Sequence, residues 1–180
     1  MESIAARYDG IDVVVGSAGI SGPHGVGIEE ISVDAWDAVM AVNVRGQFLL
    51  AKHTLKHLAA SSDPALVLIA SDSSFVAAPG MVPYNASKGA VLQLTRALSV
   101  DLSEKGIRVN CVCPSVVDTP MSRTDLGTGP AGFEAAPFPV QSPAQVADHV
   151  LYLASRRSAP INGTSIISDF GYLARSSFPA

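Results

Sequence analysis

The stretch that decides the fold is residues 65–88, ALVLIASDSSFVAAPGMVPYNASK. Its beginning, 65–70, is a continuous apolar run with the length of a buried strand. A loop rich in proline and glycine follows, and a long helical pattern then begins near Tyr84. A buried strand that leads through a loop into a helix is the repeating unit of an α/β fold with a parallel sheet.

The same alternation continues on both sides of this unit. Strands are expected at 11–15, 108–113 and 164–167, and helices at about 33–60, 84–105 and 143–155. Ser32 and Ser142 are the expected N-caps of the first and last of these helices. Residues 118–142, rich in proline and glycine, are expected to form a loop. This order predicts one domain, 1–180, built on a parallel sheet with flanking helices and right-handed crossovers.

Composition narrows the class of protein. Hydrophobic residues make up 48% of the 180 residues and charged residues 16%, which suits buried strands covered by helices. The net charge of −4, without a basic cluster, argues against a nucleic-acid partner. No apolar run reaches the length of about eighteen residues that a membrane helix needs, and no signal peptide is visible. A cytoplasmic protein without a membrane partner is therefore expected.

Cysteines and histidines offer weak signals for metal or redox chemistry. Cys111 and Cys113 are two apart on an expected strand, whereas a redox pair or metal knuckle is more often spaced C-x-x-C. We interpret them as small buried hydrophobic residues in a reducing compartment. His53 and His57 have the spacing of a zinc-protease helix but lack its glutamate, so a solvated helix face is expected and no metal site is predicted.

A candidate acid–base pair lies on the helix that begins near Tyr84. Tyr84 and Lys88 are four residues apart, so they share one helix face about one turn apart. An ammonium held near a phenol favours the phenolate and lowers the phenol pKa from its reference of about 10. Tyr84 is therefore a candidate general acid or base. Ser71 could hold the oxygen on which that proton acts, while Ser73 and Ser74 are interpreted as loop residues.

These residues belong to a series of motifs that resembles the short-chain dehydrogenase/reductase family over about residues 11–172. The segments similar to the family's conserved motifs are Asp12-Val13-Val14-Val15-Gly16-Ser17-Ala18-Gly19, Asn43-Val44-Arg45-Gly46, Ile69-Ala70-Ser71, Tyr84-Asn85-Ala86-Ser87-Lys88, Arg108-Val109-Asn110-Cys111-Val112-Cys113-Pro114 and Ser168-Asp169-Phe170-Gly171. In the family they correspond to Asn-Asn-Ala-Gly after a strand, Asn-Val-x-Gly, the segment with the catalytic Ser, Tyr-x-x-x-Lys, the strand before a Pro-Gly turn, and Asp-Gly-Gly.

The resemblance implies a Rossmann-like, doubly wound sheet and hydride transfer between NAD or NADP and a carbonyl or alcohol. It implies that Ser71 holds the substrate oxygen and that Tyr84 donates or accepts its proton. Lys88 would lower the Tyr84 pKa and bind the nicotinamide ribose, and Asn43 would complete a proton relay. The cofactor contacts that it implies are Ala18, Gly19, Tyr84, Lys88, Pro114, Val117 and Thr119. For Thr119, a helix cap before Pro120 is the alternative role.

The chain departs from the family pattern at its beginning. The family opens with a strand, a Gly-x-x-x-Gly-x-Gly turn and a helix, which together hold the cofactor pyrophosphate. This sequence begins where the family's fourth strand is about to start, so a partial Rossmann-like fold is expected, from a truncated gene product, a partial chain or a natural short form. Gly22 to Gly27 is interpreted as a flexible loop, with phosphate binding as a remote alternative. Gly16 and Ser17 replace the paired Asn, and Ser115 replaces the Gly of the Pro-Gly turn.

Three functions remain open at this point. The first is the dehydrogenase or reductase activity, the second a cofactor-independent acid–base catalyst such as a cyclase, dehydratase or isomerase, and the third a non-catalytic partner subunit. A small, apolar substrate is expected because the 118–142 loop carries Phe133 and Phe138. Strand 11–15 would leave an apolar edge. This edge predicts a homo-oligomer, a cover formed by residues 1–10, or pairing with another chain.

Overall fold

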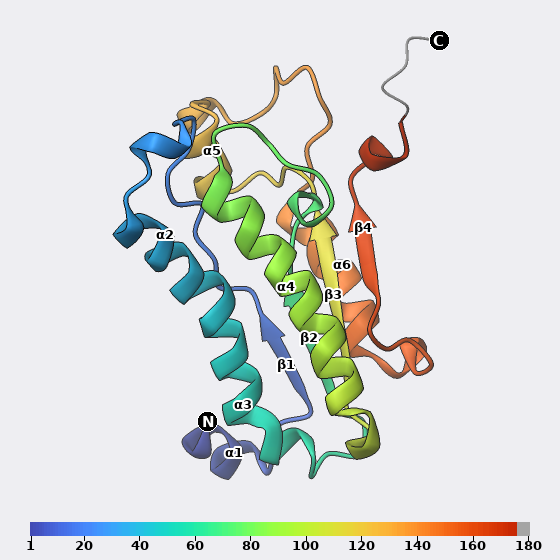
Figure 1. Ribbon diagram of the computed structural model, residues 1–180. Coiled ribbons are helices and arrows are strands. Elements are labelled where there is room, and N and C mark those ends of the chain that lie inside the picture. The colour runs from blue at the N-terminus through green and yellow to red at the C-terminus, as the bar shows by residue number, and fades with distance from the viewer. Residues whose placement is uncertain (176–180) are drawn as a thin grey trace.

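The computed structural model describes residues 1–175. Its sheet has four parallel strands in the order of the chain, which are β1 (Val13–Gly16), β2 (Ala65–Ile69), β3 (Arg108–Pro114) and β4 (Ser165–Ser168). The predicted α/β fold with a parallel sheet and flanking helices is confirmed (Figure 1). The strands all point the same way, so their carboxyl ends meet at one edge of the sheet, where ligands of such folds bind.

Helices cover both faces of the sheet. The helices are α1 (Glu2–Tyr8), α2 (Val33–Met40), α3 (Gly46–Leu58), α4 (Val82–Asp101), α5 (Pro120–Asp125) and α6 (Pro143–Ala154), with a π-helical turn η2 (Ala41–Arg45) between α2 and α3. Figure 1 shows α3 and α4 side by side over one face, with α6 behind the sheet. None of the helices in residues 1–175 has both the length and the apolar character needed to cross a membrane.

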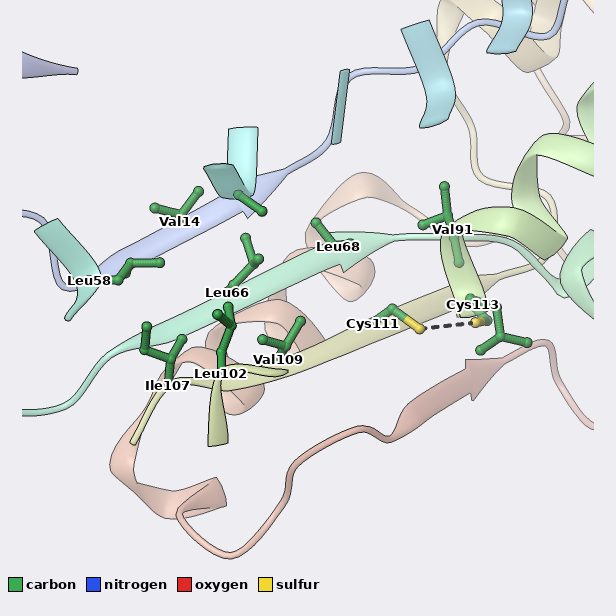
Figure 2. Packing of buried hydrophobic residues seen from close by; sticks show 13 residues of the cluster. Val14, Leu58, Leu66, Leu68, Val91, Leu102, Ile107, Val109, Cys111 and Cys113 are labelled. Atoms are coloured by element: carbon green, nitrogen blue, oxygen red, sulfur yellow. Dashed lines mark hydrogen bonds between the residues drawn. The ribbon is translucent and has the colours of Figure 1, made fainter. Parts of the chain in front are cut away.

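The core is divided between these two faces. On the α3–α4 side, alternate residues of β2 and β3 pack with residues of the two helices, and Figure 2 shows Leu66, Leu68, Val109 and Val91 in this cluster. A smaller cluster on the other face joins Val67 and Val112 to Leu153 of α6 and its neighbours. β2 and β3 are thus buried on both faces, which explains the continuous apolar sequence of β2.

The N-cap serines predicted for two helices are confirmed. Ser32 accepts a hydrogen bond from Ala35 N at 3.1 Å, and Ser142 accepts one from Gln145 N at 3.3 Å. The 118–142 segment is different, because it contains the short helix α5 and a 3-10 turn at Gly129–Ala131. The expectation of a plain loop there was wrong.

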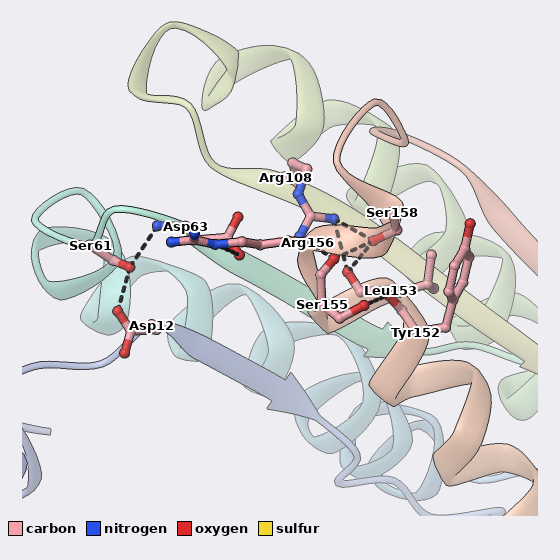
Figure 3. Close-up of polar contacts among 9 residues, drawn as sticks. All are labelled: Asp12, Ser61, Asp63, Arg108, Tyr152, Leu153, Ser155, Arg156 and Ser158. Carbon is pink, nitrogen blue, oxygen red and sulfur yellow. Dashed lines mark hydrogen bonds and ion pairs between the residues drawn. The ribbon is translucent and has the colours of Figure 1, made fainter.

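Arg108 ties the start of β3 to the end of α6. Its guanidinium, 8% exposed, donates hydrogen bonds to Leu153 O and Ser158 Oγ at 2.9 Å each and to Ser155 O at 3.3 Å (Figure 3). The two carbonyl acceptors lie at the carboxyl end of α6, where unpaired carbonyl groups attract a cation, and Ser158 lies in the 3-10 turn that follows. This network fixes α6 against the back of the sheet.

β1 forms one edge of the sheet and remains partly uncovered. Val13 and Val15 are 40% and 42% exposed. Val15 pairs with Val67, so it lies on the α6 face of the sheet, but α6 packs over β2 and β3. Residues 1–10 do not pair with this edge; they contain α1, which lies against α3 through an ion pair between Glu2 and Lys56. Of the three covers expected for this edge, the one formed by residues 1–10 was therefore wrong.

Candidate active site

The four expected catalytic residues come from three elements at the carboxyl edge of the sheet. Ser71 follows β2, Tyr84 and Lys88 lie on α4, and Asn43 lies in η2. Contacts of α4 with η2 and with the turn after β2 bring these elements together. Asn43 bonds to Ser87, the residue before Lys88, and Lys88 bonds to the end of β2.

Asn43 occupies a π-helical turn and is 1% exposed. Its Oδ1 accepts a hydrogen bond from Ile20 N at 2.8 Å, and its Nδ2 donates to Ile20 O and Ser87 Oγ at 2.9 Å each. The solvent-facing role that an asparagine in a helix could have is therefore excluded. Asn43 instead fixes the loop after β1 to α4, and the π-turn is the kind of local irregularity often found at functional sites.

Lys88 is a buried ammonium with spare hydrogen-bonding capacity. It is 6% exposed, and within residues 1–175 its Nζ donates one hydrogen bond, to Ile69 O at 2.9 Å. Burial lowers the pKa of Lys88 to about 8. An ammonium has three hydrogens, so Lys88 can bind a further acceptor at this site.

Tyr84 is half-buried, and its environment differs from the one expected. Burial raises the pKa of its phenol, and the negative charges of Asp72 and Asp125 raise the pKa further, whereas the nearby Ser71 hydroxyl lowers it when it donates to the phenolate. Lys88 does not contribute the expected lowering, because its Nζ lies over the ring, 5.5 Å from the centroid, and bonds to Ile69 O. A phenol with a raised pKa is protonated at neutral pH.

Ser71 is engaged on both its donor and its acceptor side. Its Oγ donates to Asp72 Oδ1 at 2.9 Å and accepts from Ser73 N at 3.1 Å. Ser73 and Ser74 belong to a 3-10 turn, and Ser74 Oγ donates to Lys88 O at 2.8 Å. The turn that follows β2 is thus bonded to α4, so Ser74 has a structural role beyond that of a loop residue.

The loop after β1 brings backbone close to Lys88. A Cβ on Gly19 would lie in van der Waals contact with these groups, 3.4 Å from Asn43 Oδ1 and 3.6 Å from Lys88 Nζ, so the backbone of the loop passes directly beside them. The neighbouring Ala18 O accepts a hydrogen bond from Gln47 Nε2 at 2.9 Å. The sequence did not lead us to predict Gln47, although a glutamine four residues beyond Asn43, on the same helix face, was a usable signal.

The residues present fit the nicotinamide and ribose end of a dinucleotide. The spare Lys88 hydrogens match ribose hydroxyl acceptors, and Gly19 leaves room beside them. Oε1 of the buried Gln47 has no hydrogen-bond partner, so it can accept a hydrogen bond from a donor group of a bound ligand.

The remaining expected cofactor contacts lie at the end of β3 and in the segment after it. Pro114 ends the strand, and Val117 forms an isolated bridge with Gln141. Thr119 caps α5 through a reciprocal pair of bonds with Ser122. For Thr119 the structure therefore shows the helix-cap role.

Two other sequence signals have structural outcomes. Cys111 and Cys113 are free, buried thiols with their sulfur atoms 3.9 Å apart in the core, as interpreted (Figure 2). The solvated face expected for the two histidines holds for His53, which is exposed. It is wrong for His57, whose side chain is 12% exposed and whose Nε2 lies 3.9 Å from Glu2 Oε1. Within residues 1–175 no group of three or more His, Cys, Asp or Glu side chains is placed to hold a metal ion.

Comparisons with known proteins agree on one family. Residues 1–173 match the family model described as enoyl-(acyl carrier protein) reductase. The chain is 40% identical over 173 residues to 2-(R)-hydroxypropyl-CoM dehydrogenase of Xanthobacter autotrophicus, covering 93% of this chain and 69% of that relative. It is 34% identical to cyclopentanol dehydrogenase of a Comamonas species, with coverage of 97% and 70%.

Solved structures of dehydrogenases and related proteins have a similar fold. Ligand-free aldohexose dehydrogenase of Thermoplasma acidophilum superposes with a TM-score of 0.88 at 29% identity, covering 99% of this chain and 74% of that one. ElxO with NADP bound superposes with a TM-score of 0.85 at 27% identity, covering 97% and 72%.

Proposed function

The chain belongs to the short-chain dehydrogenase/reductase family, and from this we propose that it is an oxidoreductase that moves hydride between NAD or NADP and a small alcohol or carbonyl compound. The observation that carries the proposal is the juxtaposition of a buried, partly unbonded Lys88 with Tyr84, Ser71 and Asn43. Relatives named as dehydrogenases and a similar structure with NADP bound support it.

Each residue has a role that follows from its position. Tyr84, protonated at neutral pH, donates a proton to a carbonyl oxygen or takes one from an alcohol. Ser71 holds that same oxygen. Lys88 donates its remaining hydrogens to the ribose. Asn43 holds the loop after β1 against α4 through its bonds to Ile20 and Ser87. The cofactor would supply or accept the hydride.

The cofactor contacts in the proposal form two groups. Ala18 and Gly19 lie on the loop after β1, which Asn43 and Gln47 hold in place. Pro114 ends β3 and Val117 follows it at the same edge of the sheet. Thr119 takes part through its backbone, because its side chain is committed to capping α5.

We propose a substrate that is small and largely apolar near the reacting oxygen. Phe133 and Phe138 lie on the segment between α5 and α6, and Phe138 is 43% exposed. Carboxylates of Asp72 and Asp125 lie near Tyr84, which disfavours a substrate with an anionic group there.

A homo-oligomer and a cytoplasmic location complete the proposal. The exposed Val13 and Val15 form an apolar patch at an open sheet edge, a common association surface. Cys111 and Cys113 are free thiols, which suits a reducing compartment.

The test compares Tyr84→Phe with the control Tyr172→Phe, whose ring is 60% exposed. Cofactor binding is followed by the fluorescence of NADH and NADPH, and turnover is measured with a panel of small secondary alcohols that includes cyclopentanol. Loss of a general acid or base is expected to slow turnover by about 10²–10⁴-fold in Tyr84→Phe, with cofactor binding unchanged. Equal turnover by both variants would sink the proposal. Conversion of a compound without any cofactor would favour the acid–base alternative.

A further inference from the structure

The hydroxyl hydrogen of Ser71 is already used in this structure. A serine hydroxyl has one hydrogen and two acceptor lone pairs. Ser71 gives its hydrogen to Asp72 Oδ1 at 2.9 Å and uses one lone pair on Ser73 N at 3.1 Å. One lone pair therefore remains free, and it is the group that Ser71, 6% exposed, can still offer.

Three acceptors compete for that single hydrogen. They are the Asp72 carboxylate, the phenolate form of Tyr84 and the oxygen of a bound substrate. Hydrogen bonding with Ser71 lowers the pKa of Tyr84 only if Ser71 donates to the phenolate. While Asp72 holds the hydrogen, Ser71 can only accept from the phenol.

The charged groups around Tyr84 are few and come from four elements. Asp72 lies in the turn after β2, and burial raises its pKa. Asp125 ends α5 and accepts a hydrogen bond from Ser21 Oγ at 3.0 Å. Lys88 of α4 donates to Ile69 O. Asp169, which follows β4 and faces Asp72, accepts hydrogen bonds from Gly171 N and Leu173 N.

We propose that Asp72 is a positioning residue of this site, which holds the Ser71 hydrogen so that Ser71 presents an oxygen acceptor to Tyr84 and to the hydroxyl group of an alcohol. The role in substrate binding rests on the proposed function; the effect on Tyr84 does not. Asp125 shares the charge of Asp72, but Ser21 is its hydrogen-bond partner, so it cannot act in the same way.

This arrangement is expected to give the alcohol and the carbonyl compound of the same reaction different binding affinities. An alcohol brings its own hydrogen and can donate it directly to the free lone pair of Ser71. A carbonyl compound has none, so it must draw the Ser71 hydrogen away from Asp72. The protein is therefore expected to bind an alcohol more tightly than the ketone of the same skeleton.

The test is a spectroscopic pH titration of Tyr84 in the protein without ligands. The phenolate absorbance of each variant is measured with and without the additional change Tyr84→Phe. The difference between the two titrations is the signal of Tyr84, because the other three tyrosines contribute equally to both. We expect Asp72→Ala to lower the titration midpoint of Tyr84. Ser71→Ala alone is expected to lower it, because the neutral phenol loses the oxygen that accepts its hydrogen, but to raise it in the Asp72→Ala background, where Ser71 is free to donate to the phenolate.

Asp125→Asn is the matched control, since it removes a nearby charge that does not contact Ser71. It is expected to lower the midpoint by the same amount with and without Ser71. Additive effects of Asp72→Ala and Ser71→Ala would overturn the proposal, because Asp72 would then act through its charge alone. Circular dichroism confirms folding of each variant, and Asp72→Gly replaces Asp72→Ala if the latter does not fold.

A second measurement concerns ligand preference. The Michaelis constants of cyclopentanol and cyclopentanone are compared in the wild type and in Asp72→Ala, where we expect the ratio of the ketone constant to the alcohol constant to fall. An unchanged ratio would overturn the role in substrate binding. If no variant turns over either compound while the titrations show coupling, the proposed function fails and the role of Asp72 toward Ser71 stands.

Discussion

The amide of Gln47 fills the space beside Gly16. A Cβ on Gly16 would collide with Gln47 Oε1 and would lie 2.8 Å from Leu68 Cδ2. Gln47 is 2% exposed and donates to Ala18 O at 2.9 Å. An amide from α3 thus occupies the space that a side chain at position 16 would take, with its Nε2 bonded to the loop after β1 and its Oε1 without a hydrogen-bond partner.

Positions 16 and 47 are therefore expected to be coupled. Gly16→Ala should lower the free energy of unfolding by about 1–3 kcal/mol through overpacking, and Gln47→Ala by about 1–3 kcal/mol because Ala18 O loses its partner. The double variant should lose less than the sum, by about 0.5–3 kcal/mol. Urea denaturation measures all three.

Gly89→Ala is the control for these variants. A Cβ at this position of α4 would meet nothing within 4 Å, so alanine should be neutral or stabilising by up to about 1 kcal/mol. Additive losses at positions 16 and 47 would show that Gln47 does not occupy the space that the side chain at 16 requires.

The contrast between Gln47 and the strands shows what a sequence can predict. The continuous apolar run at 65–70 indicates a strand because burial on both faces leaves few polar choices. The hydrogen bond between Gln47 and Ala18 joins residues far apart in the chain, so no periodic pattern in the sequence predicts it. Similarly, four-residue spacing places Tyr84 and Lys88 on one face, but the raised pKa of Tyr84 depends on burial and on Asp125, which only the folded chain brings near.

The 118–142 segment shows a limit of composition. Its many prolines and glycines favoured a plain loop, but Thr119-Pro120 is also a standard helix start, and the helix α5 forms there. A short cap signal that spans four residues therefore outweighs the average composition of the segment. The same local signal identified Thr119 as a helix cap, the alternative that the structure shows.

Asn43 is expected to hold the loop after β1 through Ile20. Asn43→Leu would remove both hydrogen bonds to the backbone of Ile20, at a cost of about 0.5–1.5 kcal/mol for each bond lost. Hydrogen exchange at the Ile20 amide should accelerate in this variant. Ser87→Ala removes the Asn43–Ser87 bond and the bond from Ser87 Oγ to Tyr84 O, but neither bond to Ile20, so it should leave that amide protected. Equal exchange in both variants would place the anchor of this loop elsewhere.

The open edge at β1 is expected to mediate self-association. Val13→Lys with Val15→Lys replaces an apolar patch by charges, which should shift the protein from oligomer toward monomer in light-scattering measurements. Val100→Lys changes a 72% exposed residue of α4 and serves as the control. A wild-type protein that is monomeric at all concentrations would refute the homo-oligomer proposal, and an oligomer indifferent to the lysines would exclude this edge.

Burial of Lys88 predicts an unusual dependence of stability on alkaline pH. Its folded pKa of about 8 lies below the reference of 10.5, so the unfolded chain binds more protons between these values. Stability therefore rises with pH through this window, whereas below pH 8 the buried charge costs about 3 kcal/mol.

Lys88→Met removes the buried charge, so this variant should be more stable than the wild type at pH 7. The difference between their free energies of unfolding should shrink as the pH approaches 10.5. Urea denaturation at several pH values measures the free energies of unfolding. Lys105→Met, at an exposed position, should change the free energy at pH 7 by no more than about 0.5 kcal/mol. A difference between wild type and Lys88→Met that stays constant or widens from pH 8 to 10.5 would mean that Lys88 is not desolvated in the folded protein.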